Sequence, residues 1–356
     1  MIQGTDLRTT ILEIQDNARN KKDYVLSAPL IQMNEELALH WGSATGPVTT
    51  VPSAHAHNQM ADYLNIPRKF YDRLKSDLPD LISINVNRLL GERVGEARMI
   101  RTLNGVGRAV MSDRYRRLDH EDLAENILPR IINGGQFQVE SMKITEAKFY
   151  LQIVAPRMEG EIRVGHPVQF GLLIQNSEIG EGSLSIQAMI KILRCTNGMV
   201  VPEFSHRKAH LGARLSSEGD GGSFLSMRDE TQQATDKALW MQVQDQMDSI
   251  SSPEGFQRVL ASLQERADDK LTGDPQKIVE ELSNKWALRE EERSSILYSL
   301  LREGDDTRWG LSNAVTQAAN GHASYDRAVE LEKIGGDVMA LEGTAWSGIA
   351  MAGATR

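Results

Sequence analysis

The feature that most constrains this fold is a change in the spacing of apolar residues along the chain. Before residue 216, short β-branched and apolar runs alternate with turn residues, as strands do. After residue 226, apolar residues recur every three or four positions, as in helices. Strands in runs, without strict alternation with helices, indicate an α+β fold. We therefore predict a largely antiparallel sheet with short helices in the first part, followed by a helical second part.

The same change sets the expected division of the chain. We expect an α+β sheet domain over residues 1–215, a flexible linker over 216–226, a helical region over 227–342 and a small-residue tail over 343–356. The linker contains "SSEGDGGSF", which is small, polar and glycine-rich. The helical region forms either a separate bundle or a layer of helices on the sheet. The tail needs a partner to hold it, such as a neighbouring subunit that contacts Trp346.

The composition argues against membrane-spanning and secreted classes of protein. No apolar run approaches the ~18 residues that a bilayer-spanning helix needs. The first residues lack the basic start and apolar core of a secretion signal. The single cysteine, Cys195, cannot form an internal disulfide, which is typical of a reducing compartment. We expect a cytoplasmic protein that does not enter a membrane.

Charge is distributed unevenly along this chain, whose formal net charge is -9. Residues 61–214 carry a balance of +4, whereas residues 215–350 carry -12. Such asymmetry indicates a portion that faces a polyanion and a portion that would repel one. The alternative is that the charges simply follow the solvated faces of helices.

A cluster of arginines surrounds the dipeptide Asn104-Gly105. Asn-Gly between apolar runs predicts a hairpin with a type I′ turn. A two-residue loop would place Arg101 opposite Arg108, and like charges in that position repel. A bridging phosphate would remove the repulsion, because the planar guanidinium group binds phosphate through two hydrogen bonds. The arginines of the cluster are Arg98, Arg101, Arg108, Arg114, Arg116 and Arg117.

Two further features fit a nucleic-acid site. Tyr115 offers an aromatic face on which a base could stack. A second basic segment, "SHRKAHLGAR", contributes Arg207, Lys208 and Arg214 as contacts to the phosphate backbone. The alternative is that the arginines pair within the chain, with Glu96, with Asp119 or with acids of the second part.

Signals for catalysis or metal binding are weak in this sequence. Cys195, His206 and His210 have a C-x10-H-x3-H spacing, but zinc sites usually contain more than one cysteine. The glycine-rich stretches lack the Lys-Ser/Thr ending of a phosphate-binding loop. We therefore expect no catalytic residues, no metal and no cofactor, and we interpret Cys195 as a small buried hydrophobic residue.

Four stretches together resemble a known family. They are "GVGRAVMSDRYRRLDHEDL", "FGLLIQNSEIGEGSLSIQAMIKILRCTNGMV", "HRKAHLGARL" and "TRWGLSNAVTQAA". Their content and order are similar to those of the domain-of-unknown-function family nine hundred and thirty-two. The resemblance implies a gene of phages, plasmids or other mobile elements, and it implies no particular activity.

These observations lead to two functional expectations. The first is a non-enzymatic nucleic-acid-binding protein, which binds or anneals single-stranded DNA during recombination or replication of a mobile element. It would act as a homo-oligomer, with the arginine cluster, Tyr115 and the second basic segment as its contacts. The alternative is a protein-interaction module, such as an inhibitor of host defence or a virion component, with an acidic helical surface that binds a basic partner.

Overall fold

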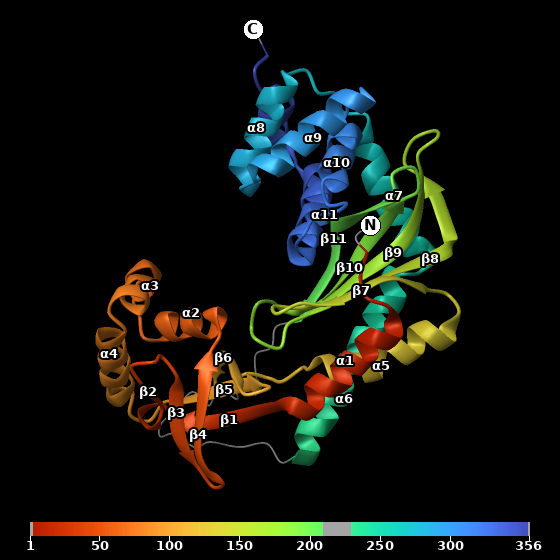
Figure 1. The fold of residues 1–356 in the computed structure, drawn as a ribbon. Helices are drawn as coiled ribbons and strands as arrows, with labels where there is room; N and C mark the ends of the chain where they lie inside the picture. The colour runs from red at the N-terminus through yellow and green to blue at the C-terminus, as the bar shows by residue number, and fades with distance from the viewer. Residues whose placement is uncertain (1–2, 209–228, 355–356) are drawn as a thin grey trace, which may run out of the picture.

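The computed structural model describes residues 3–208 and 229–354, so the predicted linker over 216–226 lies outside the described residues. Within the described part, the strands form two sheets, with the orders β1-β5-β6-β4-β3-β2 and β11-β10-β9-β8-β7. Helices follow the second sheet, which confirms the predicted α+β fold (Figure 1). None of the helices in these two ranges has the length and apolar composition that crossing a bilayer requires.

The first sheet and the helices inserted into it form the first unit of the molecule. Its core contains Trp41, Tyr71 and Ile82. Ser53 begins helix α2 because its hydroxyl accepts the backbone N–H of Ala56. The strands are β1 (Lys21–Ser27), β2 (Gln32–Met33), β3 (Leu39–Ser43), β4 (Gly46–Pro52), β5 (Ala97–Leu103) and β6 (Val106–Ser112). The helices are η1 (Ala28–Leu30), α2 (Ala54–Tyr63), α3 (Arg68–Asp77) and α4 (Pro79–Glu92).

The predicted hairpin is present between β5 and β6. Asn104 and Gly105 have φ angles of 52° and 82°, as a type I′ turn requires. Leu103 pairs with Val106, but the register then shifts and Arg101 pairs with Ala109. The predicted pairing of Arg101 with Arg108 is therefore wrong. Arg108 is the extra residue of a β-bulge, which a sequence pattern does not reveal.

The second sheet is antiparallel and is buried on both faces. Along β8, Leu151 and Ile153 belong to one apolar cluster, whereas Tyr150 and Val154 belong to another. Alternate side chains point to opposite faces of a strand, so each cluster marks one covered face. The strands are β7 (Gln138–Ile144), β8 (Phe149–Glu161), β9 (Pro167–Asn176), β10 (Leu184–Ile192) and β11 (Asn197–Lys208).

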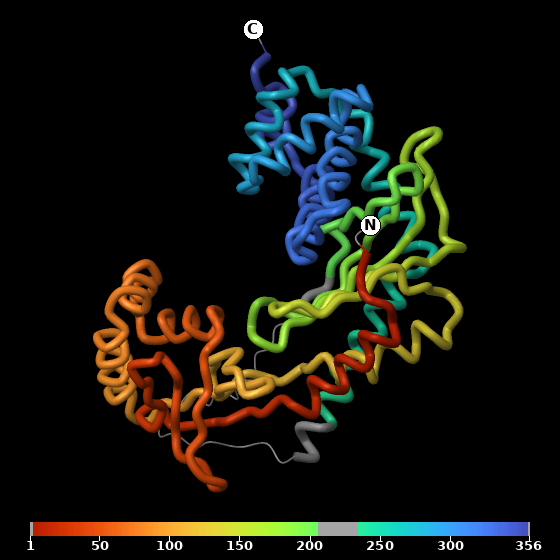
Figure 2. The backbone as a smooth tube through the Cα atoms, viewed as in Figure 1, coloured from red at the N-terminus to blue at the C-terminus, as the bar shows by residue number. Residues whose placement is uncertain are grey.

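Helices from both ends of the chain cover this sheet. Against one face lie α1 (Leu7–Asn20), α5 (His120–Gly134), α6 (Asp229–Ile250) and α7 (Pro253–Ala267). Against the other lie α10 (Arg308–Gln317) and α11 (Tyr325–Ala340), with α8 (Pro275–Trp286), α9 (Glu290–Glu303) and α12 (Gly343–Ala350) outside them. Of the two arrangements that the sequence left open, the helices therefore pack on the sheet. Figure 2 shows the result as an open arc, with the first unit at one end and α8–α10 at the other.

The small-residue tail is held by its own chain. The ring of Trp346 lies 3.9 Å from the guanidinium carbon of Arg308. Ile349 is buried, and the backbone N–H groups of Thr272 and Gly273 both donate to the carbonyl of Ala350. Trp346 therefore does not need the neighbouring subunit that we invoked from the sequence.

Helix α11 approaches the second sheet closely because it contains two adjacent glycines. A Cβ atom on Gly336 would lie 1.7 Å from the carbonyl oxygen of Val200 in β11. A Cβ atom on Gly335 would lie 2.2 Å from Cγ2 of Thr316 in α10. Both positions need a residue without a side chain, so Gly336 sets the distance of α11 from the sheet and Gly335 sets its distance from α10.

We predict that Gly336→Ala destabilises the protein. Alanine normally stabilises a helix relative to glycine, by about 0.5–1 kcal/mol. Here the added methyl group meets backbone, so we expect a loss of about 1–3 kcal/mol in the free energy of unfolding, measured in urea. Gly91→Ala in α4, where a Cβ would meet no atom within 4 Å, is the control. Equal stability of the two variants would contradict the role of Gly336.

Candidate functional site

Arg101, the centre of the predicted nucleic-acid site, is buried between the first unit and the second sheet. Only 4% of the residue is exposed. Its Nε donates to Asp23 Oδ1 at 2.8 Å, and its Nη2 donates to both carboxylate oxygens of Asp119 at 2.8 and 3.0 Å. Its Nη1 donates to the backbone carbonyl of Glu178 at 2.9 Å. The guanidinium group is thus fully occupied by its own chain.

Most of the other clustered arginines also have carboxylate partners within the chain. This is the internal pairing that we kept as the alternative, and it involves Glu96, Asp119 and an acid of the second part. Arg98 additionally lies 3.5 Å from the ring centre of Tyr63. The pairs are Arg98 with Glu96 at 3.8 Å, Arg108 with Glu178 at 3.1 Å, Arg117 with Asp23 at 3.0 Å, and Arg116 with Asp236 of α6.

The other residues predicted to contact nucleic acid lie in different parts of the structure. The hydroxyl of Tyr115 donates to the carbonyl of Ser177 at 3.0 Å, and its ring packs against a small buried cluster rather than standing free. Arg114 is exposed, and no carboxylate within the described ranges forms an ion pair with it. Arg207 and Lys208 end strand β11, where Arg207 pairs with Ser185 of β10. Arg214 lies outside the described residues.

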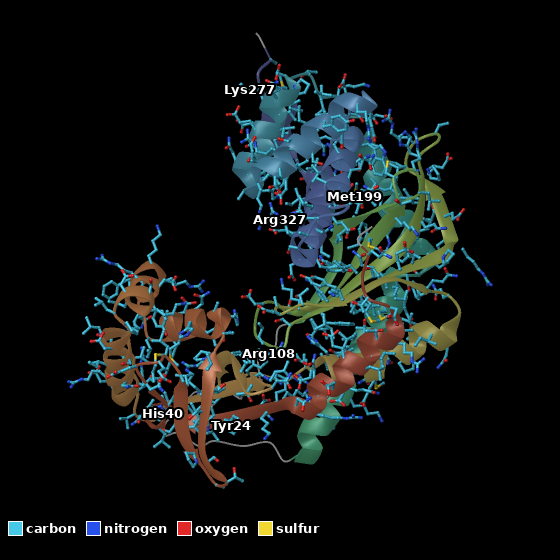
Figure 3. All side chains as sticks on the ribbon, viewed as in Figure 1. Tyr24, His40, Arg108, Met199, Lys277 and Arg327 are labelled. Atoms are coloured by element: carbon cyan, nitrogen blue, oxygen red, sulfur yellow. The ribbon has the colours of Figure 1, made fainter. Side chains whose placement is uncertain are left out.

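The ion pairs around Arg101 form one charge network, which consists of Lys21, Asp23, Arg101, Arg108, Arg117, Asp119 and Glu178. Lys21 Nζ lies 2.6 Å from Asp119 Oδ2. The network joins β1, β5 and β6 to the loop between β9 and β10, and Arg108 lies at this junction in Figure 3. The sequence reasoning missed Lys21, Asp23 and Glu178, because only tertiary folding brings them near the hairpin.

The pKa values of Glu178 and His120 indicate that the network keeps its charges at neutral pH. Burial by itself would raise the pKa of Glu178. The backbone N–H of His120 and the charges of Lys21 and Arg108 outweigh this effect, so the pKa of Glu178 lies below its usual range. Glu178 Oε1 accepts the backbone N–H of His120 at 2.9 Å. Burial lowers the pKa of the neighbouring His120 to about 4. At neutral pH the carboxylate is charged and the imidazole neutral, so the arrangement suits structural stabilisation rather than proton transfer.

Cys195 lies elsewhere, at the far end of the second sheet. The Gln317 amide donates to its Sγ at 3.2 Å, and burial raises the pKa of the thiol. A protonated thiol is a poor nucleophile. His206 lies on β11 and His210 outside the described residues, so the C-x10-H-x3-H pattern has no described geometry. Across the described ranges, no group of three or more His, Cys, Asp or Glu side chains is placed to hold a metal ion.

The first unit carries an exposed apolar stripe on helix α4. Leu78, Leu81 and Ile84 are 45%, 42% and 61% exposed. Leu78 is the N-cap residue of α4, and Leu81 and Ile84, three residues apart, lie on one side of the helix. Phe70 of the adjacent helix α3 is 52% exposed. Exposed charged residues of both signs surround them in sequence, namely Arg68, Lys69, Asp72, Arg73, Asp77, Asp80 and Arg88.

We predict that Arg101→Ala costs about 3–5 kcal/mol in the free energy of unfolding, because it removes the buried cation shared by Asp23 and Asp119 and leaves each carboxylate with one cationic partner, Arg117 and Lys21 respectively. The measurement is chemical denaturation at neutral pH. Arg88→Ala is the matched control, since its pair with Glu92 is exposed and such pairs contribute about 1 kcal/mol or less. A loss for Arg101→Ala no larger than for the control would show that the network does not hold the units together.

We also predict that acid weakens the fold below a pH of about 6.5. Burial lowers the pKa values of both His57 and His120 from 6.5 to about 4. Between these values the unfolded chain binds protons that the folded protein does not, so the free energy of unfolding falls as the pH falls. Urea unfolding at a series of pH values checks this. His120→Gln should flatten the dependence by about one proton, whereas an unchanged slope would contradict the assignment.

Comparison with known proteins gives a family and no activity. The family described as a domain of unknown function, DUF932, matches residues 108–335, which is more than half of the chain. The match begins in the hairpin strand β6 and runs to the glycines of α11. No curated protein and no solved structure matched the chain. With the second sheet and most of its covering helices inside the match, the chain belongs to the DUF932 family.

Proposed function

We propose that this chain is a non-enzymatic protein-interaction module that presents helices α3 and α4 to a protein partner. The observation that carries the proposal is the exposed stripe of Leu78, Leu81 and Ile84, together with the exposed Phe70 of the preceding helix α3. Several large apolar side chains exposed on neighbouring helices, among charged residues, are typical of interaction sites. In the phage or plasmid setting that the family resemblance implies, the module would be an inhibitor of host defence or a virion component.

The stripe is presented by a unit that is firmly attached to the rest of the molecule. Besides the charge network, His55 Nε2 and Gln59 Nε2 each lie 2.8 Å from the carbonyl oxygen of Ile179 in the β9–β10 loop. These contacts fix α2, and with it α3 and α4, relative to the second sheet. A pre-organised surface loses little conformational entropy on binding, which favours affinity.

The internal pairing of the arginines favours this proposal over nucleic-acid binding at the hairpin. The expectation of a phosphate contact depended on guanidinium groups without carboxylate neighbours. To contact DNA, Arg101 or Arg108 would first have to leave Asp119 or Glu178, and separating such buried pairs is costly. Tyr115 would have to leave Ser177 before it stacked on a base.

Nucleic-acid binding remains a second candidate because of one observation. The register of β10 and β11 places Arg207 opposite Ser185 and Lys208 opposite Leu184. These positions follow directly on the loop that holds Glu178, so both basic segments of the sequence reach the same end of the second sheet. Single-stranded DNA would then contact this end, in recombination or replication of the mobile element.

We predict that the double variant Leu81→Asp and Ile84→Asp loses a protein partner that the unchanged protein captures from nuclease-treated host lysate. Charges in the centre of an apolar interface must be desolvated, so the loss should be at least about tenfold in captured protein. Val164→Asp is the control, because Val164 is 97% exposed and lies outside the stripe. Equal capture by both variants would reject α4 as the site.

A titration with a fluorescent single-stranded oligonucleotide separates the two candidates. The protein-interaction proposal expects no binding at low salt. Binding that weakens steeply with added salt, together with capture that nuclease abolishes, would instead establish the nucleic-acid candidate.

A further inference from the structure

A pocket of about 880 Å³ lies at the other end of the molecule from the apolar stripe. Its walls come from the β8–β9 turn, the β10–β11 turn and helices α9 and α10. This volume is in the range that encloses a small molecule. The side chains that matter below are Arg163, His166, Arg194, Tyr298, Arg302 and Asn313.

Two stretches that carry the family resemblance meet in this pocket. "ILRCTNGMV" supplies Arg194 and Cys195 from the β10–β11 turn, and "TRWGLSNAVTQAA" supplies Asn313 and Gln317 from α10. Asn313 and Gln317 are four residues apart and therefore share one side of the helix. The charge network does not use these residues, and neither does the apolar stripe.

The protonation of His166 follows from its partner. Trp309 Nε1 lies 2.9 Å from His166 Nδ1, and an indole N–H can only donate. Nδ1 is therefore the acceptor, and the proton of the neutral ring sits on Nε2. Arg194 Nη1 lies 3.4 Å from this Nε2, and arginine also only donates. Two N–H donors thus face each other without an acceptor between them.

Three arginines and three carboxylates lie around this donor pair. Arg194 is exposed, and in the described part of the chain no carboxylate forms an ion pair with it. Arg163 is shared between Asp268 and Asp305, and Arg302 lies 3.2 Å from Glu303. Burial, Arg194 and Arg163 lower the pKa of His166, against the opposite effect of Asp305 and Glu303. An anionic oxygen at this point would accept from both donors and pair with the charge of Arg194.

Asn313 adds a requirement of the opposite kind. Its side chain is buried at 4% exposure, and its Oδ1 has no hydrogen-bond partner among the described residues. A buried acceptor without a donor is costly, so a ligand that brings an N–H or O–H group would be favoured here. At the mouth of the pocket, Tyr298 is 64% exposed, with the Arg302 guanidinium 5.6 Å from its ring centre. That pair offers a surface for a flat ring.

We propose that this pocket binds a small phosphorylated molecule of nucleotide size. The phosphate oxygens bridge Arg194 and the Nε2–H of His166. A hydroxyl or amino group of the ligand donates to Asn313 Oδ1, and its planar base lies against Tyr298. Phosphate suits the donor pair better than carboxylate, because its oxygens point in three directions and accept from several donors at once.

The test is isothermal titration of the full-length protein with adenosine monophosphate, inorganic phosphate and adenosine. We expect the monophosphate to bind more tightly than inorganic phosphate, and adenosine to bind at least about tenfold more weakly than the monophosphate, since it lacks the charged group. Arg194→Gln should weaken binding of the monophosphate by about tenfold or more. Arg73→Gln on α3, whose side chain is 78% exposed, is the matched control and should bind like the unchanged protein.

Other results of these titrations would overturn the site or one part of it. No saturable binding of either phosphate compound, or equal binding by Arg194→Gln and the control, would overturn the site. Equal affinity for inorganic phosphate and the monophosphate would support the anion contact and overturn the nucleotide assignment. Asn313→Ala should weaken the monophosphate and leave inorganic phosphate unchanged, and the same loss for both would overturn the role of Asn313. Because the pocket and the apolar stripe share no residue, these outcomes do not depend on the protein-interaction proposal.

Discussion

The buried guanidinium of Arg101 is the interaction on which the arrangement of the molecule depends. One side chain contacts Asp23 of β1, Asp119 at the start of α5 and the Glu178 carbonyl of the β9–β10 loop. These groups belong to the first sheet, to a helix behind the second sheet and to the second sheet itself. Beside this centre, a small apolar cluster of Met99, Ala109, Met111 and Ile179 also joins the first sheet to the β9–β10 loop.

The arginines of the network stabilise the fold and are not available to bind a ligand. Arginine is a natural phosphate ligand, but the same planar fork binds carboxylates, and here it binds those of its own chain. The charge that a partner would meet is therefore found elsewhere. At the pocket, Arg194 faces His166 with no acceptor between them. At the opposite end, α4 offers apolar side chains. The two ends differ in chemistry and call for different ligands.

The sequence predicts the elements of this fold better than their contacts. Periodicity identifies the strands of the second sheet and most helices, and Asn104-Gly105 locates the hairpin turn. The predicted helical region over 227–342 includes α11, but its pattern does not reveal that Gly336 lets the helix lie close on β11. The candidate site was harder to predict, since Arg101 meets Glu178 only through tertiary folding. The tautomer of His166 likewise depends on Trp309, 143 positions away.

The bulge at Arg108 couples local chain geometry to long-range assembly. The residue that is surplus to strand pairing in β6 is also the one whose side chain reaches Glu178 in the other sheet. Loss of a single codon there would straighten the ribbon and remove a bond between the halves in one event. A substitution of Arg108 would remove the contact with Glu178 and keep the strand register, whereas a deletion would change both.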